Sequence, residues 1–263
     1  MGTILEVKNL SMDFGGIRAL DSLSMSVNER EIVALIGPNG AGKTTFFNCV
    51  TGIYEPTGGD IYISPPEKNK TYHTNKFKPN HVTEHGLART FQNIRLFQNM
   101  TVLENVMIGR HSKSHSGILS SILRTSSQRK EEKEIIEKSY FILERIGLGK
   151  YADEFAKNLP YGLQRRLEIA RAMATEPFLL LLDEPAAGMN NSETKELDEL
   201  IKDIRDNEKI SILLIEHDMK LVMSISDRIV VLDYGEKIAE GTPDDIKSNR
   251  DVIIAYLGEE ADA

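Results

Sequence analysis

The chain has 263 residues, of which 40% are hydrophobic, and a formal net charge of −8. This length fits one large domain, or one domain with an inserted subdomain. The acidic balance argues against a nucleic-acid partner, because such a partner would need a basic face. There is no run of about 18 apolar residues and no signal-peptide pattern at the start, so we expect a cytoplasmic chain without a transmembrane segment. The single cysteine, Cys49, predicts a packed structural thiol.

Residues 4–27 alternate apolar and polar positions around turn residues at 13–16. This pattern predicts short antiparallel strands. Phe14 falls on the turn, which we expect beside the strand at 31–36 if these strands pair with one another. Its ring either stacks on an adenine or closes the edge of the core, and its position in the chain does not decide between the two.

A glycine-rich loop follows that strand. Residues 31–36 are apolar and β-branched, as in a buried strand, and a helix is expected from Thr44. Between them the chain satisfies the pattern G-x-x-x-x-G-K-[ST]. Such a loop wraps an anion with backbone N–H groups, the helix N-terminus adds about half a positive charge, and Lys43 adds a full one. We expect a nucleotide's phosphates to be bound by Gly37, Pro38, Asn39, Gly40, Ala41, Gly42, Lys43, Thr44 and Thr45. The Thr44 hydroxyl is also expected to be a ligand of Mg²⁺, which prefers oxygen.

Residues 60–63 predict another short strand, and the polar, proline-containing residues 64–81 predict an exposed loop. Three histidines, His73, His81 and His85, occur in this region. Their spacing fits no standard ligand pattern, and no cysteine or carboxylate pair accompanies them. We therefore do not expect a metal site there.

Residues 93–174 are expected to form a helical insertion between strands of an α/β core. Thr101 followed by Glu104 is a capping-box pattern and predicts a helix start. Residues 111–130 carry an apolar patch in a Ser-, Lys- and Arg-rich segment, so they either touch a membrane or partner or form a solvated surface helix. A helix over 131–147 is predicted from the helical spacing of its apolar residues Ile136, Tyr140, Leu143 and Ile146. A further helix after residue 159 has one apolar face, formed by Leu167, Ala170 and Ala174.

The last third of the chain alternates strands and helices. The run at 178–185 predicts a buried strand that ends in two carboxylates, Asp183 and Glu184. Residues 192–206 predict an amphipathic helix, and residues 210–215 predict a second buried strand. A β-hairpin is expected around residues 234–235, and a terminal helix from Pro243. Open α/β sheets place their chemistry at the carboxyl ends of such strands.

The polar residues at these strand ends suit phosphoryl chemistry. A phosphate loop needs a second acidic element, because Mg²⁺ and an attacking water must both be held beside the γ-phosphate. We expect Asp183 to bind Mg²⁺ directly or through water, and Glu184 to act as the general base. His217 is expected to hydrogen-bond the γ-phosphate or orient the water. Gln92, a neutral oxygen ligand at the start of the insertion, would report nucleotide occupancy if it touches Mg²⁺.

In order and spacing, these motifs resemble the ATP-binding subunits of ABC transporters over nearly the whole chain. Residues 37–44 resemble the Walker A motif, Gln92 the Q-loop, residues 159–163 the position of the signature motif, residues 179–184 Walker B with its catalytic glutamate, and His217 the switch histidine. The resemblance implies an α/β fold with a P-loop NTPase core, which has a mixed sheet and an antiparallel β subdomain, and an inserted α-helical subdomain.

Within this family the chain resembles the LivG-type ATPase of branched-chain amino acid importers. The segments that carry this closer resemblance lie at residues 86–97, 165–171, 183–188, 213–219 and 255–258. The resemblance implies ATP and Mg²⁺ as cofactors and adenine stacking on Phe14. It also implies a core formed by residues 1–92 and 175–263, with the helical signalling subdomain at 93–174.

The resemblance further implies partners. A second ABC ATPase subunit, of LivF type or a second copy of this chain, would complete a dimer. Two transmembrane permease subunits would dock on it at the cytoplasmic face of the membrane, in a groove lined by Gln92 and residues 93–110. An extracytoplasmic binding protein would act indirectly. The chain would be peripheral to the membrane. The solute is not encoded in this chain, because an ATPase subunit does not contact it.

The signature segment departs from the family pattern. Where the family usually reads Leu-Ser-Gly-Gly-Gln, this chain has Leu159-Pro160-Tyr161-Gly162-Leu163. In the family this segment contacts ATP held by the opposite subunit, through the serine hydroxyl and backbone N–H groups. Pro160 has neither a hydroxyl nor an N–H, whereas Gly162 and the helix N-terminus remain. Asn190 also stands where the family's D-loop usually has aspartate. We hypothesise two unequal ATP sites, a competent one on this chain's phosphate loop and one in which the partner's ATP meets the altered segment.

Two other classes compete with a transport motor. A soluble ABC-type ATPase acting on ribosomes or DNA-repair complexes usually carries two cassettes or a long coiled coil, whereas this chain has one phosphate loop and no sustained heptads. A nucleotide-binding regulator without turnover is disfavoured because Glu184 and His217 are both present.

Overall fold

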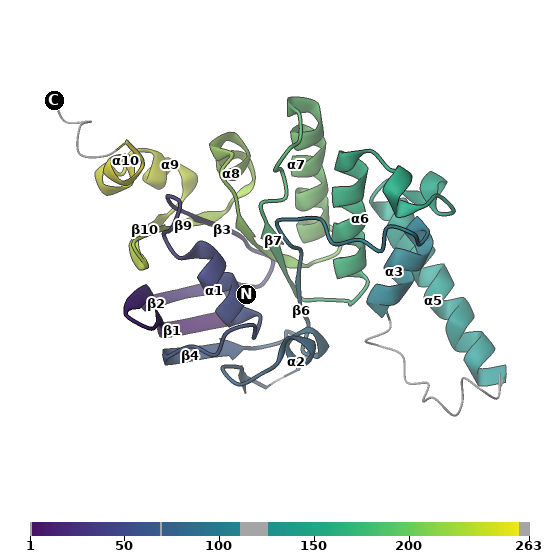
Figure 1. Cartoon of the computed structure of the whole chain (residues 1–263), viewed down its shortest axis with the longest axis horizontal. Helices are drawn as coiled ribbons and strands as arrows, with labels where there is room; N and C mark the ends of the chain where they lie inside the picture. The colour runs from purple at the N-terminus through teal and green to yellow at the C-terminus, as the bar shows by residue number, and fades with distance from the viewer. Residues whose placement is uncertain (1, 69, 111–125, 258–263) are drawn as a thin grey trace. The chain divides into compact units, whose positions relative to one another are not determined.

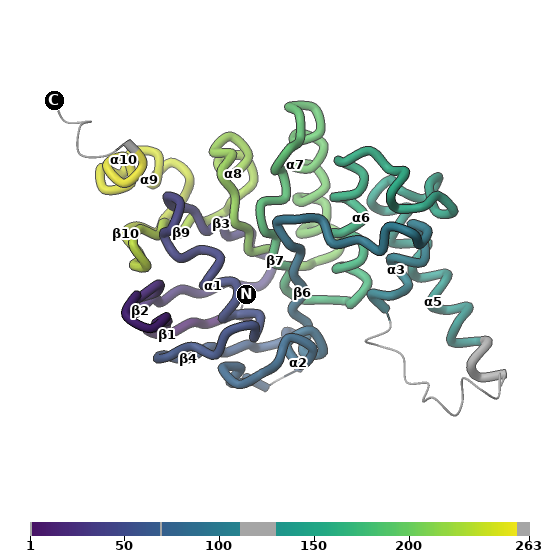
Figure 2. The backbone as a smooth tube through the Cα atoms, viewed as in Figure 1, coloured from purple at the N-terminus to yellow at the C-terminus, as the bar shows by residue number. Residues whose placement is uncertain are grey.

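The computed structural model describes residues 2–68, 70–110 and 126–257, which form parts of two compact units (Figure 1). The first unit contains Met1–Arg89 and Phe178–Ala263, and the second contains Thr90–Pro177. Figure 2 shows the backbone leaving the first unit after strand β6 (Leu87–Arg89) and returning at strand β7 (Leu179–Asp183). The three-part division at residues 92 and 174 stays a prediction.

The N-terminal sheet of the first unit is antiparallel, with strand order β2-β1-β4-β5. Its strands are β1 (Thr3–Phe14), β2 (Ile17–Asn28), β4 (Gly58–Ile63) and β5 (Tyr72–His73). The prediction of antiparallel strands in residues 4–27 is confirmed. The prediction that they are short is wrong, because the ladder continues up to the Phe14–Ile17 pair and each strand has twelve residues.

The second sheet is parallel except for one edge strand, and its order is β10-β9-β3-β8-β7-β6. Its remaining strands are β3 (Ile32–Ile36), β8 (Ser211–Ile215), β9 (Arg228–Asp233) and β10 (Glu236–Gly241). Every residue of β3, β7 and β8 is buried, as in parallel sheets covered on both faces. The predicted hairpin joins β9 to β10, and Tyr234 and Gly235 both have positive φ, as a tight hairpin turn requires.

Helix α1 lies in a core shared by both sheets. Phe46 and Phe47 are fully buried, and they belong to one cluster with residues such as Leu5 of β1 and Val33 of β3. Cys49 is buried in the same cluster, as predicted. The helices of this unit in the described structure are α1 (Lys43–Val50), α2 (Pro79–Glu84), α7 (Asn191–Asp206), α8 (Met219–Ile225), α9 (Pro243–Lys247) and α10 (Arg250–Leu257).

Residues 64–81 are not one exposed loop, so that prediction is wrong. Strand β5 pairs with β4, and α2 begins at Pro79, whose fixed φ suits the first turn of a helix. The histidines of this region have local partners. His73 Nε2 lies 2.8 Å from Asp60 Oδ1, and the His85 ring packs edge-on against Tyr72.

The second unit is helical. Its described elements are α3 (Val102–Arg110), α5 (Ser126–Arg145), the short 3₁₀ helices η2 (Gly149–Tyr151) and η3 (Ala156–Asn158), and α6 (Tyr161–Met173). The predicted capping box is present, since Thr101 and Glu104 exchange side-chain to backbone hydrogen bonds of 2.7 and 3.1 Å. The predicted apolar face of α6 is buried.

Helix α5 departs from its predicted pattern. Leu143 and Ile146 at its C-terminal end are buried, whereas Ile136 and Tyr140 remain 38% and 43% exposed. The predicted apolar face therefore packs over its last turn only. Residues 111–125, for which the sequence leaves a membrane-contacting or a solvated segment open, lie outside the described residues.

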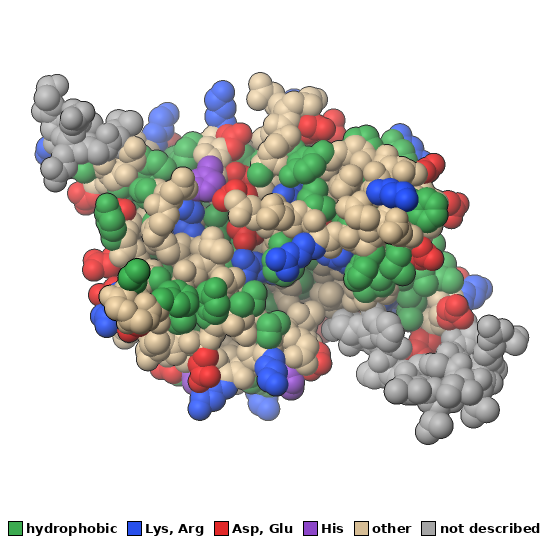
Figure 3. Space-filling view, viewed as in Figure 1, with side chains coloured by type: hydrophobic (Ala, Val, Ile, Leu, Met, Phe, Trp, Pro, Cys, Tyr) green, Lys and Arg blue, Asp and Glu red, His purple; other side chains and the backbone are tan. Residues whose placement is uncertain are grey.

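Within the described part of the chain, none of the helices combines the length and apolarity that crossing a bilayer needs. On the face shown in Figure 3, Lys and Arg side chains are scattered among Asp and Glu side chains.

Candidate nucleotide-binding site

The glycines of the phosphate loop occupy positions where a side chain does not fit. Gly42 has φ of +100°, and a Cβ there would lie 2.6 Å from the Ala19 carbonyl oxygen. Gly37 has φ of +149°, and a Cβ there would lie 2.1 Å from the Leu232 carbonyl oxygen. The loop therefore packs closely against β2 and β9, which holds its backbone in one path.

Helix α1 presents its N-terminus directly after this loop. Its N-cap is Gly42, which makes no side-chain cap, and its first turn has no acidic residue. Such an end leaves backbone N–H groups and positive dipole for an anion. Lys43 Nζ donates to the carbonyl oxygens of Gly37 and Pro38 at 2.7 and 2.8 Å. Burial lowers the pKa of Lys43, while Glu184 and Asp183 raise it, so both carboxylates lie within electrostatic range of the ammonium group.

Asp183, at the end of β7, is held by an arginine that sequence reasoning missed. Arg89 Nη2 lies 2.7 Å from Asp183 Oδ2, and both side chains are buried. Arg89 Nη1 also donates to Asn48 Oδ1 of α1 at 2.7 Å. The arginine therefore joins the acidic strand end to the phosphate-loop helix. The one available signal was its place at the end of β6, three residues before Gln92.

The Glu184 carboxylate meets the histidine that the sequence placed on the neighbouring strand end. Glu184 Oε1 lies 2.9 Å from His217 Nε2. The Glu184 backbone has φ of +47°, and its N–H donates to the Ile215 carbonyl at 2.9 Å. A glutamate in this left-handed conformation stores about 1–3 kcal/mol of strain. This backbone conformation accompanies a side chain that meets His217, which follows β8.

A buried carboxylate fixes this arrangement. Glu216 is 4% exposed, and its Oε1 accepts from the Ala186 N–H at 2.7 Å. Its Oε2 accepts from the His217 N–H at 2.8 Å. One side chain therefore ties the segment after Glu184 to the segment that carries His217. This role was not predicted, because its only signal in the sequence is a glutamate beside the histidine.

Phe14 and Gln92 were also predicted to bind nucleotide. Phe14 is 42% exposed at the end of β1, and its ring lies edge-on to Tyr54 with centroids 5.3 Å apart. Its strand partner β2 passes Gly42 at Ala19, so its turn lies near the phosphate loop. Gln92 belongs to the second unit. Adenine stacking on Phe14 and a metal contact of Gln92 stay predictions.

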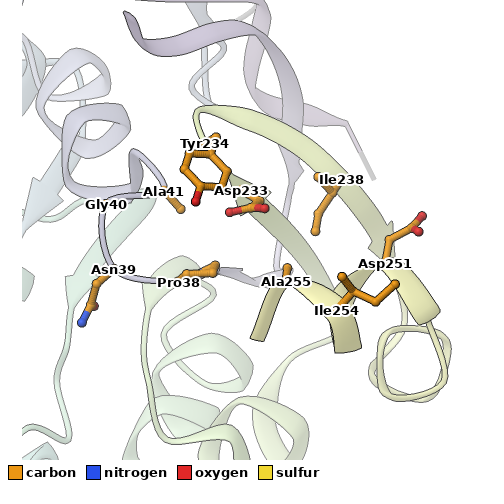
Figure 4. A pocket seen from close by; sticks show the side chains of 10 residues that line it. All are labelled: Pro38, Asn39, Gly40, Ala41, Asp233, Tyr234, Ile238, Asp251, Ile254 and Ala255. Carbon is orange, nitrogen blue, oxygen red and sulfur yellow. The ribbon is translucent and has the colours of Figure 1, made fainter. Parts of the chain in front are cut away.

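A cavity of about 780 Å³ lies beside the tip of the phosphate loop (Figure 4). It is lined by Pro38, Asn39, Gly40, Ala41, Asp233, Tyr234, Ile238, Asp251, Ile254 and Ala255. Lys43, Asp183 and Glu184 are not among these described lining residues, so the cavity adjoins the phosphate site rather than containing its chemistry. Burial raises the pKa of Tyr256, the next residue of α10, and the nearby Gly37 backbone acts in the opposite direction. Residues 255 and 256, which belong to the segment 255–258 singled out in the sequence, therefore lie next to the phosphate loop.

The two departures from the family pattern have local structural roles. Pro160 is the N-cap of α6 and makes no side-chain cap, and Tyr161 begins the helix with its side chain 45% exposed. Asn190 is the N-cap of α7, where its side chain accepts from the N–H groups of Ser192 and Glu193. Asparagine caps a helix about as well as aspartate, which accounts for this substitution.

These features define a class of protein. A glycine phosphate loop between β3 and α1, an aspartate and a glutamate at the end of β7, and a histidine after β8 together form a nucleoside-triphosphate site on a parallel sheet.

Comparison with known proteins gives the particular family. The model of the family described as "ABC transporter" matches residues 20–187, and that of the family "Branched-chain amino acid ATP-binding cassette transporter" matches residues 236–262. The chain belongs to the ABC transporter family. The predicted cassette fold and the predicted class, an ATP-hydrolysing subunit of an ABC transporter, are confirmed.

Three relatives illustrate the match. The chain is 52% identical to the high-affinity branched-chain amino acid transport ATP-binding protein LivG of Salmonella typhimurium, over 97% of this chain and 98% of that protein. It is 48% identical to BraF of Pseudomonas aeruginosa, a protein of the same description, over the same shares. A crystal structure of an ABC transporter ATP-binding cassette in its ADP conformation has a TM-score of 0.84 and 32% identity, covering 98% of this chain and 100% of that one.

Proposed function

We propose that this chain is the ATP-hydrolysing subunit of an importer for branched-chain or related amino acids. The hydrolytic part rests above all on the Glu184–His217 pair beside a complete phosphate loop. The transport part is supported by the relatives, since LivG and BraF are named as branched-chain amino acid transport proteins and match nearly the whole chain.

The residues at the site suit Mg²⁺. Thr44 offers an exposed hydroxyl at the start of α1, Asp183 offers a carboxylate at the end of β7, and Gln92 is the further ligand that we propose. The described residues hold no cluster of three or more His, Cys, Asp or Glu able to bind a metal. A site with few protein ligands suits Mg²⁺, which takes one or two of them and completes its shell with waters and phosphate oxygens. When bound, it would neutralise charge on the transferring phosphoryl group.

In our proposal the chain's own groups divide the work of hydrolysis. The loop N–H groups of residues 37–45 and the Lys43 ammonium bind the phosphates, and the exposed Phe14 ring stacks on the adenine. Glu184 accepts the proton of the attacking water. His217 orients Glu184 through their 2.9 Å contact and, when it turns away, can donate to the γ-phosphate. Glu216 keeps both segments in register.

Association with other subunits follows from the same proposal. The chain would form a dimer with a LivF-type ATPase or with itself, and two permease subunits would dock at its second unit on the cytoplasmic face of the membrane. An extracytoplasmic binding protein would supply the solute. In this dimer the two ATP sites are unequal, because the partner's nucleotide meets Pro160 and Tyr161 rather than a serine and a glycine.

The test is reconstitution. The chain is purified with the permease and ATPase subunits that co-isolate with it, placed in proteoliposomes, and given ATP inside and binding protein loaded with radioactive leucine outside. We expect leucine uptake that needs ATP and is lost in Glu184→Gln. Co-isolation with ribosomes instead of membrane subunits would support the soluble alternative, which the transport relatives do not favour. Uptake of another solute, with leucine excluded, would refute the amino-acid assignment.

A further inference from the structure

Helix α6 contains a fully buried ion pair that none of the proposed chemistry uses. Arg165 Nη1 lies 2.8 Å from Glu168 Oε2, and the two side chains are 0% and 1% exposed. The Nε atom of Arg165 is buried without a hydrogen-bond partner among the described atoms. Replacing a buried ion pair with apolar residues is often neutral or stabilising. Stability alone therefore does not explain why a charged pair occupies this position.

The pair binds the backbone on both sides of Gln92. Arg165 donates to the carbonyl oxygens of Phe91 and Gln92, each at 2.7 Å, from its two terminal nitrogens. Glu168 Oε1 accepts from the Arg95 N–H at 3.3 Å. These contacts join a segment without regular structure to a helix more than 60 residues away in the sequence. A movement of the Gln92 backbone therefore has to displace the guanidinium group or break two short charge-assisted hydrogen bonds.

The same guanidinium group reaches the altered signature segment. Arg165 Nη2 lies 3.5 Å from the hydroxyl of Tyr161, the first residue of α6. Gln164 ties the same turn to the preceding chain, since its Nε2 donates to the Leu159 carbonyl at 2.9 Å. The buried arginine thus lies between Gln92 and the exposed start of α6. Only a planar fork with several fixed donors can hold all of these partners at once.

We propose that Arg165 is a positioning residue that couples the two ATP sites of the dimer. This inference rests on the proposed function, in which Gln92 senses this chain's nucleotide and the start of α6 meets the partner's. Nucleotide at the phosphate loop shifts Gln92, the guanidinium group follows its two carbonyls, and the first turn of α6 moves with it. Packed networks of this kind carry coupling between sites, but only a measured coupling demonstrates it.

Hydrogen exchange on the full chain tests this coupling without turnover. The wild-type chain is compared with and without Mg²⁺ and a non-hydrolysable ATP analogue. We expect nucleotide to slow amide exchange by about fivefold or more in residues 90–96 and also in residues 161–166. In Arg165→Lys the change at 90–96 should persist and the change at 161–166 should disappear, because an ammonium group cannot hold both carbonyls. Lysine leaves a charge for Glu168, so the core is not left with a lone buried carboxylate.

Two further variants sharpen the result. Arg166→Lys makes the same substitution one residue along α6, where the side chain lies near Gly147 instead, and both responses should stay as in wild type. The double change Arg165→Met with Glu168→Met replaces the pair by apolar groups and should lose the second response as Arg165→Lys does. A wild-type chain without any response at 161–166, or an Arg165→Lys chain that keeps it, would overturn the proposal.

Failure of this inference and failure of the proposed function give different results. If leucine uptake depends on Glu184 but the exchange responses of residues 161–166 do not depend on Arg165, only the coupling is wrong. If uptake is absent while the exchange responses behave as expected, the transport assignment is wrong and the coupling within the chain stands.

Discussion

Two helix N-termini of this chain use the same backbone physics at different strength. Helix α1 begins after Gly42 and helix α6 after Pro160, and neither has a side-chain cap. Each end leaves N–H groups and positive dipole for an anion. At α1 a glycine loop and Lys43 surround that end, whereas α6 follows a residue without N–H or hydroxyl and starts with a bulky tyrosine. The residues around a helix end, more than the helix itself, therefore set how well that end holds a phosphate.

The largest expected effect comes from removing the proposed general base, Glu184. In the assembled complex, Glu184→Gln should lower ATP turnover by about 10²–10⁴-fold, because an amide cannot accept the proton of the attacking water. The measurement is steady-state phosphate release. Glu199→Gln, an exposed change on α7, is the matched control and should leave turnover unchanged. If only the equivalent change in the partner ATPase abolished turnover, the competent site would be the one on the partner's phosphate loop, and the proposal would be wrong.

A smaller effect, a loss of nucleotide affinity, is expected when a side chain is added at Gly42, where the phosphate loop packs closely against β2. Gly42→Ala places a Cβ against the Ala19 carbonyl at a φ of +100°, so the loop has to shift. We expect nucleotide affinity to fall by about tenfold or more, from a backbone strain of about 1–3 kcal/mol. Titration with a fluorescent ATP analogue measures it. Gly16→Ala meets open space and should bind as wild type; equal affinity in both variants would show that the loop is not held tightly.

Tighter ATP binding is expected when the start of α6 is given a better N-cap residue. Pro160→Ser restores a hydroxyl and an N–H at the N-cap of α6, where serine is a preferred residue. One added hydrogen bond to the partner's nucleotide contributes about 1 kcal/mol, so the KM for ATP of the complex should fall about fivefold. The exposed Pro66→Ser change is the control. An unchanged KM would mean that the segment does not approach the partner's phosphates.

The smallest expected effect is that of nucleotide on the alkylation of Cys49 in helix α1. Cys49 of α1 is 2% exposed, and burial raises the pKa of its thiol to about 12. The neutral thiol should therefore dominate at all pH values below about 11, and alkylation of the native chain should stay slow between pH 7 and 9, where an ordinary thiol becomes strongly reactive. Added nucleotide should change the rate little. Rapid labelling of the native chain would contradict this prediction, because it would show that α1 opens and exposes the Cys49 thiol.

Local patterns predicted most of the elements because their signals lie within a few residues. The phosphate loop, the Thr101–Glu104 capping box, the hairpin at Tyr234 and the buried strand before Asp183 each follow from spacing and side-chain type. Where the prediction was wrong, pairing partners distant in sequence decided. Strand β5 exists because β4 lies beside it, and β1 and β2 are long because their ladder continues to the turn.

In the site, too, single residues were predicted from local sequence, whereas their contacts with distant partners were not. Glu184 and His217 were predicted separately, as strand-end residues, and their 2.9 Å contact appeared only in the structure. Arg89 and Glu216 were missed because their partners are distant in sequence and leave no mark in the local pattern. Asp183 ends β7, and the Ala186 N–H lies in the turn after β7.

Residues that are neighbours along the chain were enough to predict the phosphate loop and the acidic strand end, and the resemblance to ABC transporter subunits added the predicted switch histidine His217 and the altered signature segment at 159–163. Only the tertiary structure decided what holds them. It placed Arg89 on Asp183, Glu216 on the Ala186 N–H, and Arg165 on the Phe91 and Gln92 carbonyls. Those contacts arise when separate strands and helices pack, and burial then requires each charged group to find a partner that no short stretch of sequence contains.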